Sequence, residues 1–292
     1  MDQIKILDMN KLRLILFLLI LSEIYSSDCF AQAWVQKKGG SYSQIAYSSI
    51  VGESKYNNSG DPLDLVRKVS DRTLQLYHEH GITDKLTVVG TIPIKFVQTG
   101  DEIVSSGFTG NTLPAGSLTS LGNASLAFIY GLKQNSTWVY SVQLRTDLNT
   151  ASREEKTGLQ TGIDAWGLAP SFHIGYGASG FWSAFDIGTN FRTNDYSTQF
   201  YSNIQLGTKV KKVVDVIGQF QVLQSFEDGN HNDGNAIETG LYTNNLEYAA
   251  YSLKVGYGIK EHITLWGAIG GGVSGNDVLR APAFTLAVSY KR

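Results

Sequence analysis

Beyond residue 31, the chain alternates apolar and polar side chains with a period of two over many short segments. Successive side chains of a β-strand point to opposite faces, so each segment predicts a strand with one apolar and one polar face. Segments of about ten residues match the length that a strand needs to cross a membrane. The twelve expected strands lie near residues 41–51, 72–80, 85–97, 121–131, 137–147, 164–176, 181–192, 198–208, 213–226, 246–257, 262–272 and 282–291.

The connections between these strands differ in length from one end of the strands to the other. The tight turns repeat a corner in which a glycine follows a ring residue, as at Gly81, Gly131 and Gly258. Short turns at one end and long loops at the other are typical of outer-membrane barrels. The pattern therefore predicts both termini at the short-turn end, in the periplasm. Short turns are expected at 81–84, 132–136, 177–180, 209–212 and 258–261, and the long loops include 52–71, 98–120, 148–163 and 227–245.

The charges within the strands all fall on the polar face, which is the second sign of a membrane barrel. The apolar faces carry large aromatic residues near their ends, such as Trp138, Tyr176 and Tyr290, as expected for rings at a membrane interface. Inside lipid every backbone donor and acceptor needs a partner within the protein, which excludes an open sheet edge. The fold class predicted is all-β, a single closed antiparallel transmembrane β-barrel of about twelve strands over residues 32–292.

The first 31 residues resemble an export signal. Lys11 and Arg13 precede the apolar run "LILFLLIL", and small residues before Ala31 and Ala33 suit cleavage after either one. The alternative is a membrane anchor, but the run is shorter than the roughly 20 residues that a helix needs to span. The only cysteine, Cys29, lies within this leader, so the exported chain has no disulfide.

Composition narrows the function classes. The net charge is −2 and charged residues make up 17% of the chain, so no basic field recommends a nucleic-acid partner. The expected partners are outer-membrane lipid and lipopolysaccharide, the outer-membrane assembly machinery and a small-molecule solute. The predicted location is the outer membrane of a bacterial cell.

The stretch "YHEHGITDKLTVVGTIPIKF" resembles the hairpin of the second and third strands in a family of outer-membrane barrels, the channels of the MetA pathway of phenol degradation. The segments "AWVQKKGGSYSQIAY", "GLQTG", "FRTND" and "GGGVSGNDVLRAPAFTLAVSYKR" fit the same family. The resemblance covers most of the chain after the leader. It implies a barrel that passes hydrophobic or aromatic compounds, related in concept to the long-chain fatty-acid channels.

The polar face supplies the candidate lumen. Its charges are expected either to line a solute path or to pair with one another as a structural polar core. Unlike the fatty-acid channels, the chain has too few residues before Ser41 for a long N-terminal plug, so loop 98–120 or the lumen side chains are expected to narrow the pore. The candidate lumen-lining residues are Lys95, Arg145, Asp147, Asp186, Arg192, Asp215 and Lys254.

Pro93 and Pro170 interrupt two of the expected strands. Proline cannot donate to a strand ladder, so each marks a bulge in the wall or, in the alternative interpretation, a gap through which an apolar solute leaves sideways.

Other motifs carry little chemistry. His78 and His80 share a strand face without a third metal ligand, and "EDGNHNDGN" at 227–235 lacks the spacing of a calcium loop. A barrel enzyme would need a nucleophile, a histidine and a carboxylate at its rim, for which only His173 and His262 remain. We therefore expect no enzyme, no cofactor and no metal. The leading hypothesis is a passive channel, and the alternative is a structural or surface-interaction barrel without an open pore.

Overall fold

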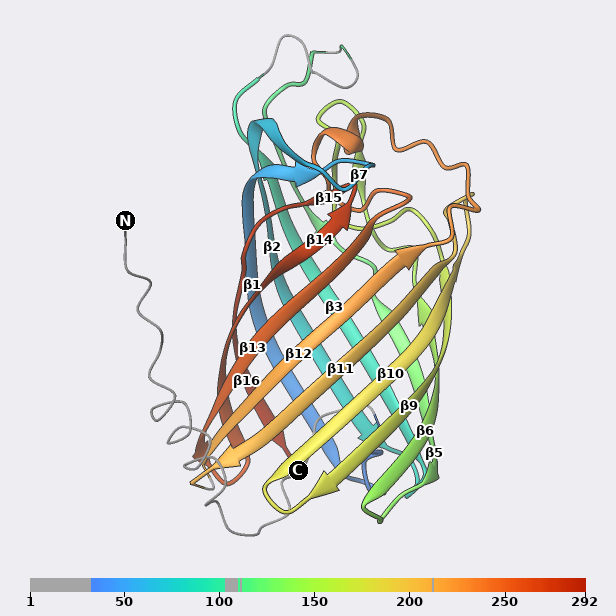
Figure 1. Cartoon of the computed structure of the whole chain (residues 1–292), viewed down its shortest axis with the longest axis vertical. Coiled ribbons are helices and arrows are strands. Elements are labelled where there is room, and N and C mark those ends of the chain that lie inside the picture. Colours follow the sequence, from blue (N-terminus) through green and yellow to red (C-terminus); the bar gives the residue numbers. More distant parts are fainter. Residues whose placement is uncertain (1–32, 103–109, 111, 212) are drawn as a thin grey trace, which may run out of the picture.

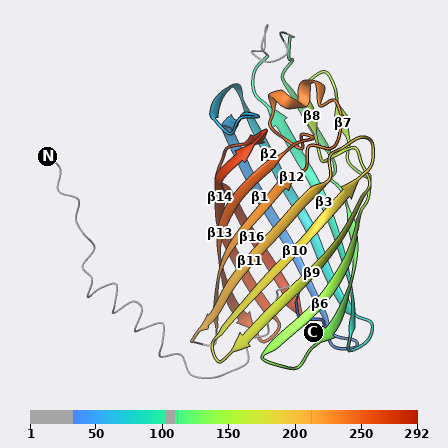
Figure 2. The same cartoon turned by 45° about the vertical axis from the view of Figure 1, so that its right-hand side comes forward.

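The computed structural model describes residues 33–102, 110, 112–211 and 213–292. In this part of the chain twelve antiparallel strands close a tilted barrel (Figures 1 and 2), which confirms the predicted fold. The predicted signal peptide, 1–31, lies outside the described residues. The barrel strands are β1 (Ser41–Tyr56), β2 (Pro62–Gly81), β3 (Leu86–Thr99), β5 (Ser125–Lys133), β6 (Trp138–Asp147), β9 (Gly167–Ala178), β10 (Phe181–Arg192), β11 (Gln199–Val210), β12 (Val214–Ser225), β13 (Glu247–Lys260), β14 (Ile263–Asn276) and β16 (Ala283–Lys291).

The barrel closes because its first and last strands pair. β1 pairs with β16 from Tyr42↔Lys291 to Ile50↔Ala283, and on its other edge it pairs with β2. The ladder therefore continues around the wall, as the lipid environment requires.

Short elements complete the chain at the end that carries the long loops. They are β4 (Gly116–Leu121), the hairpin of β7 (Arg153–Glu154) and β8 (Leu159–Gln160), the 3-10 turn η1 (Gly234–Glu238) and β15 (Val278–Leu279). β4 and β5 are two halves of one wall strand, because both pair with β3. Among the described residues no helix is long and apolar enough to cross a membrane.

The tight turns gather at one end of the barrel, called here the turn end, and the long connections at the other, called the loop end (Figure 1). The predicted sorting of turns and loops is therefore present. The long loop expected over 52–71 is wrong. β1 and β2 continue past the other strands and pair as far as Tyr56↔Pro62, so only 57–61 are left as a turn. The polar composition of this stretch indicated a loop, but its backbone still pairs.

The outer surface of the wall is a belt of apolar side chains. Tyr251, Phe284 and Leu286 are all more than half exposed to solvent. At the turn end Trp138 and Tyr176 pack ring to ring with centroids 4.8 Å apart. In water such a surface would be unfavourable, whereas lipid tails cover it at no cost, with the aromatic rings at the interface.

Candidate functional site: the barrel lumen

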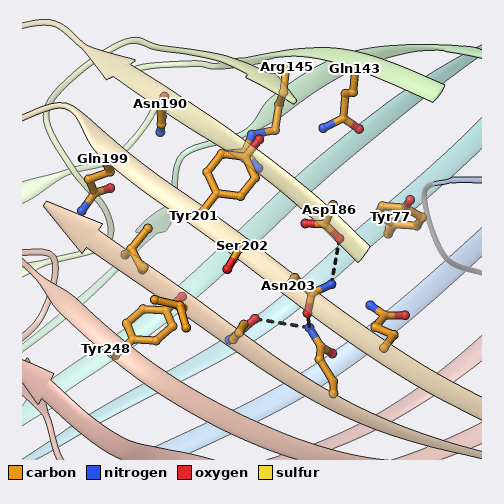
Figure 3. Close-up of a pocket in the computed structure, with 15 residues that line it drawn as sticks. Tyr77, Gln143, Arg145, Asp186, Asn190, Gln199, Tyr201, Ser202, Asn203 and Tyr248 are labelled. Atoms are coloured by element: carbon orange, nitrogen blue, oxygen red, sulfur yellow. Dashed lines mark hydrogen bonds between the residues drawn. The ribbon is translucent and has the colours of Figure 1, made fainter. Parts of the chain in front are cut away.

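Among the cavities in the described part of the lumen, three share lining residues. The central cavity has a volume of about 360 Å³ and lies against β6 and β10 to β13 (Figure 3). A second, of about 350 Å³, lies toward the turn end, and a third, of about 470 Å³, lies against β13, β14 and β16. The central and third cavities share Gln219, Gln221 and Tyr248, whereas the second and third share Lys254. The cavities therefore form one region inside the barrel.

A chain of hydrogen bonds crosses the wall of the central cavity. Asn203 donates its side-chain amide to Asp186 Oδ1 at 2.9 Å. Gln219 Nε2 donates to Asn203 Oδ1 at 2.7 Å and is 3.3 Å from Gln221 Oε1. The dashed lines of Figure 3 follow this ladder across β10, β11 and β12. The inward positions of these strands therefore hold neutral amides joined to one carboxylate.

Two of the predicted lumen charges, one of which lines the central cavity, neutralise each other. Arg145 Nε lies 2.9 Å from Asp147 Oδ1, two residues along the same strand face. The Arg145 guanidinium also lies 5.6 Å from the centre of the Tyr201 ring. Tyr201 leans across Gly188, where a Cβ atom would lie 2.6 Å from the tyrosine hydroxyl oxygen. Glycine at 188 therefore makes room for the ring that meets Arg145.

Lys95 is held at the loop end of the lumen by a residue that the sequence analysis assigned to a loop. Its Nζ atom lies 2.9 Å from Asp71 Oδ2 and 5.1 Å from the centre of the Tyr242 ring. Tyr242 donates its hydroxyl to the same Asp71 oxygen at 2.5 Å. Asp71 thus joins β3 to the loop that follows η1.

The remaining predicted lumen residues occupy different positions. Asp215 lies 3.7 Å from Lys209 near the turn end. Arg192 donates to the carbonyl oxygens of Ser197 and Asn244 at 2.5 and 2.7 Å, and so belongs to the loop end rather than to the central cavity. Lys254 lines the second and third cavities and forms no ion pair within the described ranges.

Inward-folded loops cover the loop end of the lumen. Leu159 of β8 and Leu241 pack against Val69, Val97 and Leu279 of the wall. Buried polar side chains bind the backbone of the same cover. Gln160 Nε2 donates to the carbonyl oxygens of Leu241 and Tyr242 at 2.8 and 3.0 Å. Lys55 Nζ donates to the carbonyl oxygen of Ile237 at 2.7 Å. Of the predicted narrowing loop 98–120, residues 103–109 and 111 lie outside the described residues.

A short N-terminal segment, residues 33–40, covers the turn end. Ala33 is 1% exposed, and its carbonyl accepts a hydrogen bond from Gln134 at 3.0 Å. The Gln36 backbone N–H donates to Thr87 Oγ1 at 2.8 Å, and its side chain donates to Glu79 at 2.6 Å. The expectation that only a loop or lumen side chains narrow the pore is therefore wrong. A few residues are enough because the barrel is narrow and its inner wall offers partners to their backbone.

Tryptophans form an apolar layer beneath this segment. Trp34 meets Trp182 edge to face at 6.4 Å between ring centres. Both rings need glycine beside them, since a Cβ at Gly175 would lie 2.5 Å from Trp34 and one at Gly207 would lie 2.1 Å from Trp182. The layer continues through Trp266, whose Nε1 donates to Ser289 at 2.9 Å.

Pro93 lies at a one-residue bulge. On one edge of β3 it stays in register with Gln75, whereas on the other the ladder breaks between Thr91↔Ser125 and Ile94↔Leu121. Residues 122–124 thus face residues 92–93. The break is filled, since Gly122 donates to the Pro93 carbonyl at 2.9 Å, and Asn123 Nδ2 donates to Leu148 and Ile163 at 3.0 and 2.9 Å.

Pro170 lies in a continuous ladder with β6, opposite Leu144. On its other edge the pairing with β10 lapses between Gly188↔Ser171 and Phe191↔Leu168 without a change of register. Each proline therefore keeps one ladder intact and interrupts the other, because it lacks the N–H that a second neighbour would need.

The histidines and the Asp- and Asn-rich loop that the sequence offered as weaker candidate sites make structural contacts. The His78 and His80 rings stack at 6.4 Å, and across the described ranges no group of three or more potential metal ligands occurs. His173 is buried in the wall with Nε2 at 2.8 Å from Ser171 Oγ. In loop 227–235, hydrogen bonds from the Thr198 side chain and from the Thr198 N–H, the latter at 2.6 Å, lower the pKa of the Asp228 carboxyl.

Sequence reasoning missed the residues that close the lumen. Trp34 and Tyr242 lie outside regular strands, and Asp71 lies just before the expected start of its strand. An aromatic residue immediately after the expected cleavage site was the available signal for Trp34. The amides Asn203, Gln205 and Gln219 lie on the polar face of their strands, but neutral side chains carry no distinctive motif that would mark a site.

Comparison with known proteins connects this geometry to a family. The sequence matches the model of the family described as "Putative MetA-pathway of phenol degradation" over residues 64–286. A search of curated proteins by sequence gives no match.

Solved structures share the barrel. The chain is similar to the COG4313 outer membrane channel from Pseudomonas putida F1, with a TM-score of 0.69, 13% identity, and coverage of 92% of this chain and 100% of that one. It is also similar to the beta domain of the Bordetella autotransporter BrkA, with a TM-score of 0.51, 10% identity, and coverage of 88% and 100%. For the KdgM porin in complex with disordered oligogalacturonate, the values are 0.50, 8%, 85% and 98%. At these identities the likenesses establish the fold.

Proposed function

We propose a passive channel function for this chain, which belongs to the family described as "Putative MetA-pathway of phenol degradation". Its cargo would be small molecules, including hydrophobic or aromatic ones, that cross the outer membrane by diffusion. The observation that carries the proposal is the set of cavities inside the barrel that share lining residues. A purely structural barrel has no need of such space, since small barrels can be filled by side chains.

The chain is an outer-membrane barrel, as its lipid-facing belt and its fold indicate. We assign the turn end, with residue 33 and the C-terminus, to the periplasm. The loop end would then face outside the cell. This orientation is supported by the usual sorting of short turns to the periplasmic side of such barrels.

The two covers determine how the channel would work. The loop cover and the 33–40 segment each depend on a limited set of hydrogen bonds and on few apolar contacts. The loop cover has one apolar cluster, and the 33–40 segment packs Trp34 against one cluster and Val35 against another. Such segments open locally at lower free energy than the wall strands, which are paired along both edges. A solute would therefore enter when one cover opens, equilibrate in the lumen and leave past the other.

The family's cargo is proposed for this chain and not established by the fold. The COG4313 structure is described as an outer membrane channel, and the BrkA domain of similar fold belongs to an autotransporter. The COG4313 channel supports passage of solutes through this fold. The BrkA domain shows that proteins of the same fold can serve different functions.

Uptake into proteoliposomes tests the proposal. The full mature chain is reconstituted, and entry of toluene, catechol and glucose is followed after rapid mixing, with liposomes that lack protein as the control. The proposal predicts entry of at least one solute at a rate proportional to the amount of barrel. Rates equal to those of empty liposomes for all three would favour the structural or surface-interaction barrel.

A further inference from the structure

We propose that the central cavity is a binding site for a neutral solute whose ring carries hydroxyl groups, in preference to a hydrocarbon or an anion. The inference rests on the proposed channel function and names the solute class that this part of the lumen selects. It follows from the charge, the amides and the rings around one cavity of about 360 Å³.

The charged groups of the cavity lining are held by neighbouring side chains. Arg145, the cation of the lining, is paired with Asp147 at 2.9 Å, and Asp186 accepts the hydrogen bond from Asn203 at 2.9 Å. An anionic solute would have to displace Asp147 to gain a partner of opposite charge. Removing an ion from water without a partner is costly, so the cavity disfavours anions.

The amides supply both donors and acceptors to the cavity. Gln143 is 4% exposed, and its Oε1 atom has no hydrogen-bond partner among the described residues. The ladder through Asn203 and Gln219 borders the same space (Figure 3). A hydroxyl group can donate to one amide and accept from the next. A hydrocarbon would displace water and leave these groups without partners, which sites built for hydrogen bonding reject strongly.

Tyrosine rings flank the amides. Tyr201 projects from β11 and Tyr248 from β13, on two sides of the space that the labelled amides surround (Figure 3). Flat aromatic faces favour contact with another ring by stacking or edge contact. A single ring with hydroxyl groups at its edge therefore places its faces toward tyrosine and its edge toward the amides. A phenolic ring and a sugar ring share this chemistry.

Calorimetric titration of the full mature chain in detergent tests the inference. The probes are catechol and glucose as hydroxylated rings, toluene as the hydrocarbon and benzoate as the ion. The variant Gln219→Leu removes the centre of the ladder, and Gln143→Met removes the unpartnered oxygen with little change of shape. Gln44→Leu is the control, because Gln44 lines the second cavity and not the central one. Heat-dependent gel mobility checks that each variant is a folded barrel.

The inference predicts that catechol or glucose binds more tightly than toluene and benzoate. Binding of catechol would identify the solute as a phenolic ring, and binding of glucose would identify it as a sugar ring. The loss of one or two hydrogen bonds in Gln219→Leu and Gln143→Met should raise the Kd about five- to tenfold, with Gln44→Leu unchanged. Equal or tighter binding of toluene or benzoate, binding that the lumen variants leave unchanged, or no binding of either hydroxylated ring would overturn it. If any of these results occurred while toluene still entered proteoliposomes, the binding site would be wrong but the channel function would still be supported. If no solute entered, the channel function itself would be wrong.

Discussion

Trp34, from the N-terminal segment, lies edge to face against Trp182 of β10, with ring centres 6.4 Å apart and ring planes at 78°. The contact joins residues far apart in sequence and closes the turn end of the lumen. Trp182 is 4% exposed and belongs to an apolar cluster with Ile217 and Trp266. The apolar layer at the turn end is therefore built partly from Trp34, which lies just after the predicted leader.

Loss of the Tyr242 hydroxyl should loosen the loop cover. Tyr242→Phe removes a hydrogen bond to the Asp71 carboxylate, which already faces Lys95. Hydrogen bonds to charged groups contribute about 1.5–3 kcal/mol, so hydrogen exchange of the loop after η1 should accelerate by roughly tenfold or more. Tyr176→Phe, on the outer face at the opposite end, serves as the matched control. Exchange that is equal in both variants would show that this hydroxyl does not hold the cover.

Arg145 and Arg192 should differ in their effect on ion selectivity. Arg145→Ala leaves Asp147 without its cation beside the central cavity, so the reversal potential in a salt gradient should shift toward cation selectivity. Arg192→Ala instead removes donors to Ser197 and Asn244, and should lower the stability of the loop end with little change in selectivity. A selectivity unchanged by Arg145→Ala would mean that the Arg145–Asp147 pair serves only the structure of the wall.

These two arginines also show how much of the lumen the sequence alone predicts. Strand alternation placed both on the polar face, which the register of β6 and β10 reproduces. Alternation predicts which face of a strand a side chain lies on, but not its position along the barrel axis. That position depends on strand tilt and on loops such as 193–198, in which the Ser197 carbonyl accepts a hydrogen bond from Arg192. The fold was predictable because lipid imposes one periodicity on every strand, whereas the covers depend on irregular segments without a period.

The packing of loop 227–246 should depend on pH through Asp233. Burial raises the pKa of the Asp233 carboxyl, and the hydrogen bond from the Asn244 N–H at 2.8 Å offsets this only in part. A raised folded-state pKa means that the packed loop holds the proton more tightly than the open one. Its contribution is fully present below the unfolded value of about 3.9 and is lost as the pH rises through the folded value.

Hydrogen exchange of residues 233–244, corrected for the intrinsic rate, should therefore show protection that falls as the pH rises from acid toward neutral. Asp233→Asn should flatten this dependence. A wild-type profile that stays flat, or one that rises with pH, would contradict the assigned role of Asp233.

Surface labelling tests the proposed orientation. The exported chain has no cysteine if the leader is removed, so single cysteines can be introduced cleanly. Asn58→Cys lies in the turn between β1 and β2 at the loop end, and Asn135→Cys lies in the turn between β5 and β6 at the other end. On intact cells a membrane-impermeant maleimide should label position 58 and not position 135, and lysis should make both reactive. Labelling of position 135 on intact cells would reverse the topology.

Single-channel conductance in planar bilayers tests the central claim, that the covered lumen is the solute path. In Gly175→Ala the added methyl group would lie 2.5 Å from the Trp34 ring and displace it, whereas in Gly218→Ala, a control on β12, it would meet no atom within 4 Å. The account predicts a larger or more frequently open conductance for Gly175→Ala than for wild type, with Gly218→Ala unchanged. If Gly175→Ala and wild type conduct identically, or if neither conducts at all, the lumen beneath Trp34 is not the path.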